Sequence, residues 1–157
     1  MYSTIMIRRG KRHRGRRGAA AVETAVVAPV LVVLFLGAVD MGQYANCYQK
    51  VSDAAREGAR LAARFEVTDA SLVETAVEDY LKERFPHVSP CRIRYESTVT
   101  VSDGQGHLIT GSDLGLVETG SPIEVDVSLK YDAVRWMGGL DILTNRELQI
   151  TSVMRRE

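Results

Sequence analysis

The stretch GAAAVETAVVAPVLVVLFLGAVD, residues 18–40, decides the architecture of this 157-residue chain. Between residues 25 and 39 it holds no charge, and only Pro29 and Gly37 interrupt the aliphatic run. A helix over residues 19–39 would be roughly 32 Å long, enough to cross the ~30 Å hydrocarbon core of a bilayer. That span contains one carboxylate, Glu23, which is costly in hydrocarbon unless it is paired or lies at the interface. The sequence therefore predicts a single transmembrane helix over residues 19–39.

Charge is distributed unevenly around this stretch. The chain is formally neutral, with 20 basic and 20 acidic residues, but residues 1–18 hold seven Lys and Arg and no acid. From residue 19 onward, 13 basic residues stand against 20 acidic ones, so the remainder carries a net charge of −7. The positive-inside rule therefore predicts a cytoplasmic leader over residues 1–18 and places residues 40–157 outside the cytoplasm. The acidic remainder argues against a nucleic-acid partner.

Three other kinds of N-terminal segment fit part of the pattern. A cleaved secretory signal needs small residues after the apolar run, whereas the chain reads VDMG at residues 39–42. A lipoprotein signal modified at Cys47 lacks the apolar and small residues that should precede that cysteine. An uncleaved single-pass anchor, whose outer domain binds another protein or a ligand, fits everything except the spacing of Gly18 and Glu23. The uncleaved anchor is the main alternative.

The residues around Gly18 resemble a prepilin-type processing signal. A polybasic leader ends at Gly18, Ala19 would begin the mature chain, and Glu23 would be its fifth residue. The block AAREGAR follows the aliphatic run at residues 54–60. With this block, residues 17–60 resemble the TadE-like family of minor pilins from the tight-adherence (Tad/Flp) pilus system.

The resemblance implies a structural, non-enzymatic role and a defined set of partners. A minor pilin or pseudopilin of this family would lie in the cytoplasmic membrane and be cut between Gly18 and Ala19 by a prepilin peptidase. It would contact the lipid bilayer, other pilins and the pilus assembly machinery, with no cofactor, no metal and no nucleic acid. Glu23 would pair with its own new α-amine or with that of a neighbouring subunit, because either charge alone is costly to bury. Thr24 departs from the family, which more often carries an aromatic residue after the glutamate.

The helix is predicted to extend beyond the membrane over residues 40–65. Apolar and small residues recur there at intervals of three and four, which indicates one helix face. These residues are Tyr44, Tyr48, Val51, Ala55, Gly58, Ala62 and Phe65. The small side chains of Ala54, Ala55, Gly58 and Ala62 would let another backbone approach closely. We expect this face to pack on the chain's own sheet, because the downstream domain needs a covering helix.

Residues 66–157 are predicted to form a small α+β domain. A second helix should run from Asp69 or Ser71 to Phe85, where Pro86 stops it. Alternating apolar and polar residues predict three strands and, after the turn DGQG, a short fourth strand. These are residues 93–101, 123–131, 148–154 and, for the short strand, 107–110. The expected fold class is α+β and pilin-like, with a second helix and an antiparallel sheet of three or four strands.

The polar residues show no catalytic or metal-binding pattern. His13, His87 and His107 lack the spacing of metal ligands, and no serine or cysteine lies in a nucleophile motif. Cys47 and Cys91 would both lie in an oxidising compartment, which allows either a disulfide or two free thiols. We therefore expect a protein that acts through helix packing and not as an enzyme.

Overall fold

The computed structural model describes residues 15–135, 143 and 145–157, and the chain divides into two compact units, residues 1–36 and 37–157. Helix α1, Gly15–Ala62, begins in the first unit and ends in the second. The predicted basic leader lies outside the described residues, except for residues 15–18.

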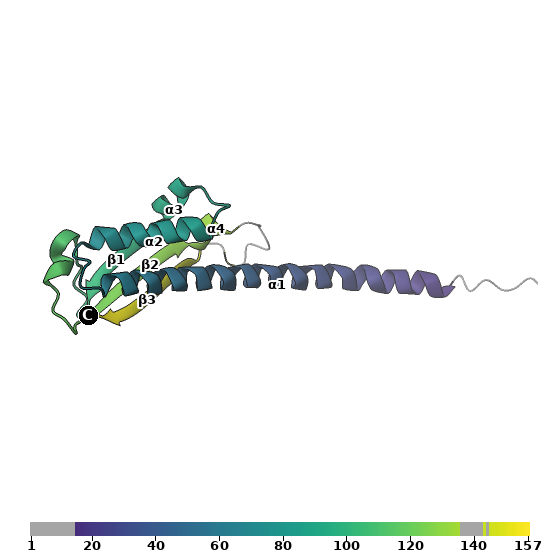
Figure 1. Cartoon of the computed structure of the whole chain (residues 1–157). Coiled ribbons are helices and arrows are strands. Elements are labelled where there is room, and N and C mark those ends of the chain that lie inside the picture. The colour runs from purple at the N-terminus through teal and green to yellow at the C-terminus, as the bar shows by residue number, and fades with distance from the viewer. Residues whose placement is uncertain (1–14, 136–142, 144) are drawn as a thin grey trace, which may run out of the picture. The chain divides into compact units, whose positions relative to one another are not determined.

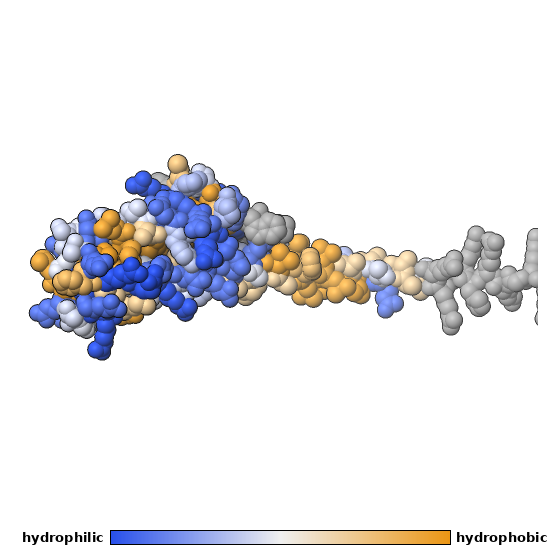
Figure 2. All heavy atoms as spheres, in the orientation of Figure 1, coloured by the Kyte–Doolittle hydropathy of each residue, from blue (hydrophilic) through white to orange (hydrophobic). Residues whose placement is uncertain are grey.

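In the first unit, α1 carries the apolar stretch. Every residue from 18 to 35 is exposed, and Pro29 lies inside the helix. Hydrophobic residues cover most of the visible surface of this part of the helix (Figure 2). Among the described residues, Gly18–Ala62 is the one helix long and apolar enough to cross a membrane. An apolar surface of this extent is stable only against lipid or against other helices.

The second unit is built on a three-stranded antiparallel sheet in the order β1-β2-β3. The strands are β1 Ser97–Asp103, β2 Pro122–Lys130 and β3 Glu147–Arg155. Helix α2, Ala70–Arg84, and the second half of α1 lie together against the sheet (Figure 1). The unit is therefore α+β, as the sequence predicts.

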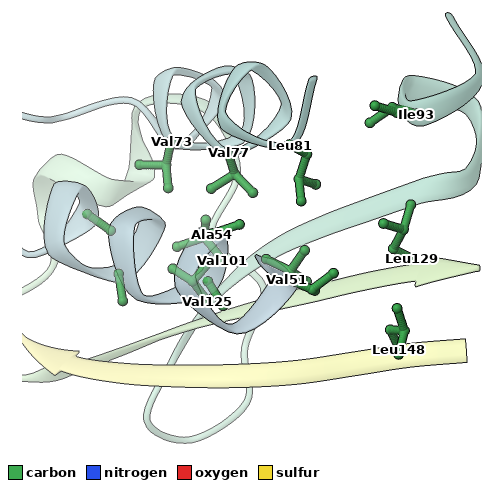
Figure 3. Packing of buried hydrophobic residues seen from close by; sticks show 14 of the residues in the cluster. Val51, Ala54, Val73, Val77, Leu81, Ile93, Val101, Val125, Leu129 and Leu148 are labelled. Carbon is green, nitrogen blue, oxygen red and sulfur yellow. The ribbon is translucent and has the colours of Figure 1, made fainter. Parts of the chain in front are cut away.

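The core lies between the two helices and the sheet. Figure 3 shows Val51 and Ala54 of α1 facing side chains from α2, such as Val77, and from the sheet, such as Val125 and Leu129. Strand β2 supplies every second residue to this core, Ile123, Val125, Val127 and Leu129, all fully buried. That alternation is the period of two expected of a strand with one covered face.

The two helix boundaries in the second unit have local causes. The side chain of Asp69 accepts a hydrogen bond from Ser71 N at 2.9 Å and so caps the start of α2. The helix ends at Arg84, and its C-cap residue Phe85 directly precedes Pro86. Helix α1 ends at Ala62, three residues earlier than predicted, and Phe65 is 72% exposed.

Three short helices were not predicted. They are α3 Pro90–Glu96, the 3₁₀ helix η1 Gly111–Leu116 and α4 Tyr131–Val134. The prediction of a strand from residue 93 is wrong, because Pro90 at the first turn starts a helix and β1 begins only at Ser97. Residues 107–110 add a single bridge, Ser102 to Leu108, and not a fourth strand.

The antiparallel arrangement gives the second unit two distinct ends. At one end β1 finishes, β2 starts and β3 finishes, and the last carbonyl of α1, Ala62 O, accepts a hydrogen bond from Arg156. We call this the Ala62 end. At the other, Tyr131 follows β2 and reaches Asp40 of α1, so we call it the Asp40 end.

Candidate functional site

Glu23 lies on the exposed surface of the apolar part of α1. With Thr24, Val27, Ala28 and Leu31 it lines a groove of about 270 Å³ along the helix. The Thr24 hydroxyl donates to Ala20 O at 2.9 Å, so this polar side chain is satisfied within the helix. Glu23 therefore presents a carboxylate on a surface that is mostly aliphatic.

The predicted processing site, Gly18 and Ala19, lies in the first turns of α1. Both residues are helical and exposed, and a side chain added to Gly18 would meet no atom within 4 Å. Ala19 and Glu23 are four residues apart and therefore share one helix face. About one helical turn therefore separates Glu23 from Ala19, the residue that would follow the predicted cut.

The small residues of α1 lie in the core of the second unit. Ala54, Ala55 and Ala62 are fully buried, and Gly58 is buried between α2 and the sheet. A Cβ atom built on Gly58 would lie 2.5 Å from Val77 Cγ2 and 3.2 Å from Val125 Cγ1. This close approach is made by the chain's own elements, so these small residues fill an intramolecular interface.

The Asp40 end holds a buried polar contact that sequence reasoning missed. Asp40, 2% exposed, directly follows the apolar span, and the Tyr131 hydroxyl donates to its Oδ1 at 3.3 Å. Tyr44 packs edge-on against the Tyr131 ring, with centroids 5.3 Å apart. Burial, and then the adjacent Asp40 carboxylate, raise the pKa of Tyr131 to about 12, so the phenol stays neutral and donates. A lone aspartate after the span gave no sequence signal of a partner 91 residues away.

The Ala62 end is closed by an arginine from the C-terminal segment. Arg156 is 3% exposed, and its guanidinium donates to Ala62 O and Val67 O, both at 3.2 Å. Glu157 N donates to Ala63 O at 2.8 Å. Carbonyls at the C-terminal end of a helix have no intrahelical partners, and a cation there is also attracted by the negative end of the helix dipole. Arg156 therefore caps the end of α1 from a distant part of the chain. The sequence does not predict this role, because lysine and arginine are common near the C-terminus of a chain.

Both cysteines are free thiols in the structure. Cys47 is 5% exposed and faces the core from α1, whereas Cys91 is exposed on α3. Burial raises the pKa of the Cys47 thiol, which makes it a poor nucleophile.

Both histidines within the described residues, His87 and His107, have polar partners in the fold. His87 Nε2 lies 2.8 Å from Val134 O, and His107 Nδ1 lies 3.2 Å from Asp103 Oδ2 in the turn that joins β1 to the next segment. No group of three or more His, Cys, Asp or Glu in the described part of the chain could hold a metal ion. His13 lies outside the described residues.

The comparison with known protein families finds a match in the N-terminal part of the chain. Residues 18–60 match the family model described as TadE-like protein. No curated protein and no solved structure matches the chain. The match begins at Gly18, includes Glu23 and the whole apolar stretch, and ends two residues before α1 does. Over this segment, residues 18–60, the chain is therefore similar to the TadE-like protein family.

Proposed function

We propose that this protein is a minor pilin or pseudopilin, a structural component in assembly of a Tad/Flp-type adhesive pilus. The family match implies an association with the Tad pilus, and family members are in general not enzymes. The observation that carries the finer proposal is the position of Glu23. It is a single carboxylate on an exposed apolar helix, five residues after a glycine that ends a basic leader.

The proposed route begins with the leader inside the cytoplasm and the second unit outside it. A prepilin peptidase would cut between Gly18 and Ala19, and the new α-amine would carry a positive charge at neutral pH. Glu23 of one subunit would then pair with its own amine or with the amine of a neighbour. Either pairing offsets the cost of holding both charges in the bilayer.

The groove beside Glu23 supports a neighbouring helix as the partner. Ala28 is small, and Val27 and Leu31 continue the same face at intervals of four. A second helix could therefore approach closely and bury its aliphatic side chains there. The partners expected are other pilins, the assembly machinery and the lipid bilayer.

The deciding experiment is the intact mass of the membrane-bound protein. Loss of the first 18 residues supports the pilin proposal, whereas a full-length mass supports the uncleaved single-pass anchor. Gly18→Val should block the cut, because a peptidase that cuts after glycine must exclude a side chain there. Gly15→Val is the matched control, since it changes a glycine of the same leader away from the junction. Normal processing of Gly18→Val would contradict the assignment of the site.

The topology can be tested with the chain's own cysteines. Cys91 is exposed and Cys47 is buried, so a membrane-impermeant maleimide should label Cys91 from outside the cytoplasmic membrane. Cys91→Ser is the control and should lose the label. Labelling that requires disruption of the membrane would place the second unit in the cytoplasm and overturn the proposed orientation.

A further inference from the structure

The Ala62 end exposes four large apolar side chains. Their exposed fractions are 72% for Phe65, 57% for Leu72, 67% for Leu108 and 81% for Leu116. They come from four different segments, namely the turn after α1, the first turn of α2, the loop after β1, and η1. Single exposed leucines are common, but four at one end of a small unit indicate a contact surface.

These segments are held together by backbone hydrogen bonds. Gly115 N donates to Thr68 O at 3.1 Å, which ties η1 to the turn after α1. Gly104 N donates to Pro122 O at 3.1 Å, which ties the turn after β1 to the start of β2. Leu114, next to the exposed residues of η1, is fully buried and anchors this helix in the core. The apolar side chains are therefore presented by a fixed framework.

A hollow of about 560 Å³ lies at the same end. Leu116, Val117 and Pro122 provide its apolar lining, and Asp103, Asp113 and Glu118 provide carboxylates. Backbone N–H groups, first of His107 and then of Gln105, hold the pKa of Asp103 below its ordinary value, so this group is ionised at neutral pH.

The charge around the exposed apolar residues is mainly negative. Segments 63–69, 103–107, 111–122 and 155–157 hold six carboxylates and three arginines. One of these arginines, Arg156, is buried against backbone carbonyls and does not contribute to the surface. Within the described part of the chain, Asp113 and Glu118 have no ion-pair partner. Such a surface attracts a cationic group and repels another acidic one.

We propose that the Ala62 end is a docking surface for a segment of a different protein that presents leucine-like side chains next to lysines or arginines. The hollow fits a long basic side chain, whose aliphatic stem can lie on Leu116 while its head meets Asp113 and Glu118. A second copy of this chain fits poorly, because residues 40–157 hold 19 acidic against 13 basic residues. A bacterial membrane surface fits poorly too, because anionic lipid head groups repel these carboxylates. The proposal does not rest on the pilus assignment, since Glu23 plays no part in it.

The test uses the full-length protein in detergent and a short helical peptide with leucines on one face and lysines on both flanks. The matched peptide carries glutamates in place of the lysines. We expect the lysine peptide to bind, measured by fluorescence anisotropy of a labelled peptide, and the glutamate peptide to bind at least tenfold more weakly. Raising the salt concentration should weaken binding of the lysine peptide, because exposed charges are screened.

Variants at both ends of the unit locate the surface. Leu116→Ser should weaken binding about tenfold or more, since burial of a leucine is lost. Asp113→Asn with Glu118→Gln should weaken it roughly threefold to tenfold and reduce its salt dependence. Glu83→Gln with Glu147→Gln makes the same charge change with exposed residues outside these segments and should leave binding unchanged.

Several outcomes would overturn the proposal. These are absence of lysine-peptide binding, equal binding of the two peptides, or unchanged binding by Leu116→Ser. Binding to phosphatidylcholine vesicles that Leu116→Ser abolishes, without peptide binding, would assign the surface to a membrane. Concentration-dependent self-association lost in the same variant would assign it to a second copy.

Discussion

Adding one methyl group to α1 should have opposite effects on stability at Gly58 and at Gly42. A Cβ atom at Gly58 would lie 2.5 Å from Val77 Cγ2, inside van der Waals contact, whereas a Cβ atom at Gly42 would meet nothing within 4 Å. Both glycines lie inside α1, so both replacements by alanine gain the same helix propensity, up to about 1 kcal/mol. The difference between the two variants therefore measures packing alone.

The strain at Gly58 is not easily relieved. Val77 is 1% exposed, and a β-branched side chain in a helix has one strongly preferred rotamer. On the opposite side, Val125 Cγ1 would lie 3.2 Å from the new atom. Overpacking of this kind costs about 1–3 kcal/mol. After subtraction of the propensity gain, Gly58→Ala should destabilise the fold by about 0–2 kcal/mol, and Gly42→Ala should stabilise it by about 0.5–1 kcal/mol.

Thermal unfolding of the full-length protein in detergent, followed by circular dichroism, measures both effects. At about 2–4 °C per kcal/mol for a chain of this size, Gly42→Ala should raise Tm by about 1–4 °C, and Gly58→Ala should lower it by up to about 8 °C. Chemical denaturation of the same samples provides an independent midpoint. Equal positive shifts would refute the reasoning, because they would mean that the second unit accepts a side chain at Gly58.

Three further predictions concern single side chains. Tyr131→Phe should destabilise the fold by about 1–3 kcal/mol at neutral pH by leaving the Asp40 carboxylate short of a donor. The pKa of Tyr131 is raised to about 12 in the folded protein, so between pH 10 and 12 only the phenol of the unfolded chain ionises. Over this range the free energy of unfolding should fall by about 2–3 kcal/mol more for the wild type than for Tyr131→Phe. Parallel pH curves of the two proteins would contradict this. Arg156→Gln should lower the free energy of unfolding, measured by chemical denaturation, by about 2–4 kcal/mol. The control Arg155→Gln, at the neighbouring exposed residue, should change it by less than about 0.5 kcal/mol. Similar losses in the two variants would rule out a specific cap. Glu23→Gln should insert into the membrane normally but lose cross-links between cysteines placed near residue 19 of neighbouring pilins, and wild-type cross-linking would make Glu23 a tolerated head-group residue.

The sequence correctly predicts the elements that have a long apolar run, a proline that ends a helix, or a clear alternation of apolar and polar residues. The apolar run makes α1 unmistakable, Pro86 marks the end of α2, and four alternating residues identify β2. The strand predicted from residue 93 is wrong for a simple reason. Ile93 packs into the core from a short helix, and a few apolar positions cannot distinguish the period of a helix from that of a strand.

The polar contacts that close the second unit were beyond sequence reasoning. Asp40 and Tyr131 are 91 residues apart, and Arg156 and Ala62 are 94 apart, so nothing in the local pattern connects them. The proposed membrane site is different in kind. Gly18 and Glu23 are close in sequence, and helix geometry alone puts Glu23 on the same face as Ala19, where the proposed cut would create a new N-terminus.

The position of β3 in the chain has a consequence for biosynthesis. Until β3 arrives, β2 has one unpaired edge with four apolar side chains on its core face, and the end of α1 has no cap. A chain that stops or is clipped after residue 135 would therefore present a strand edge able to pair with another copy. Pairing of β3 with β2 joins residues 17 to 33 positions apart, compared with four positions in a helix, so this step should be slow relative to formation of the helices. A protease or a holding chaperone that recognises extended apolar strands would thus have its opportunity during this interval, and nascent chains should be most vulnerable to aggregation just before β3 pairs.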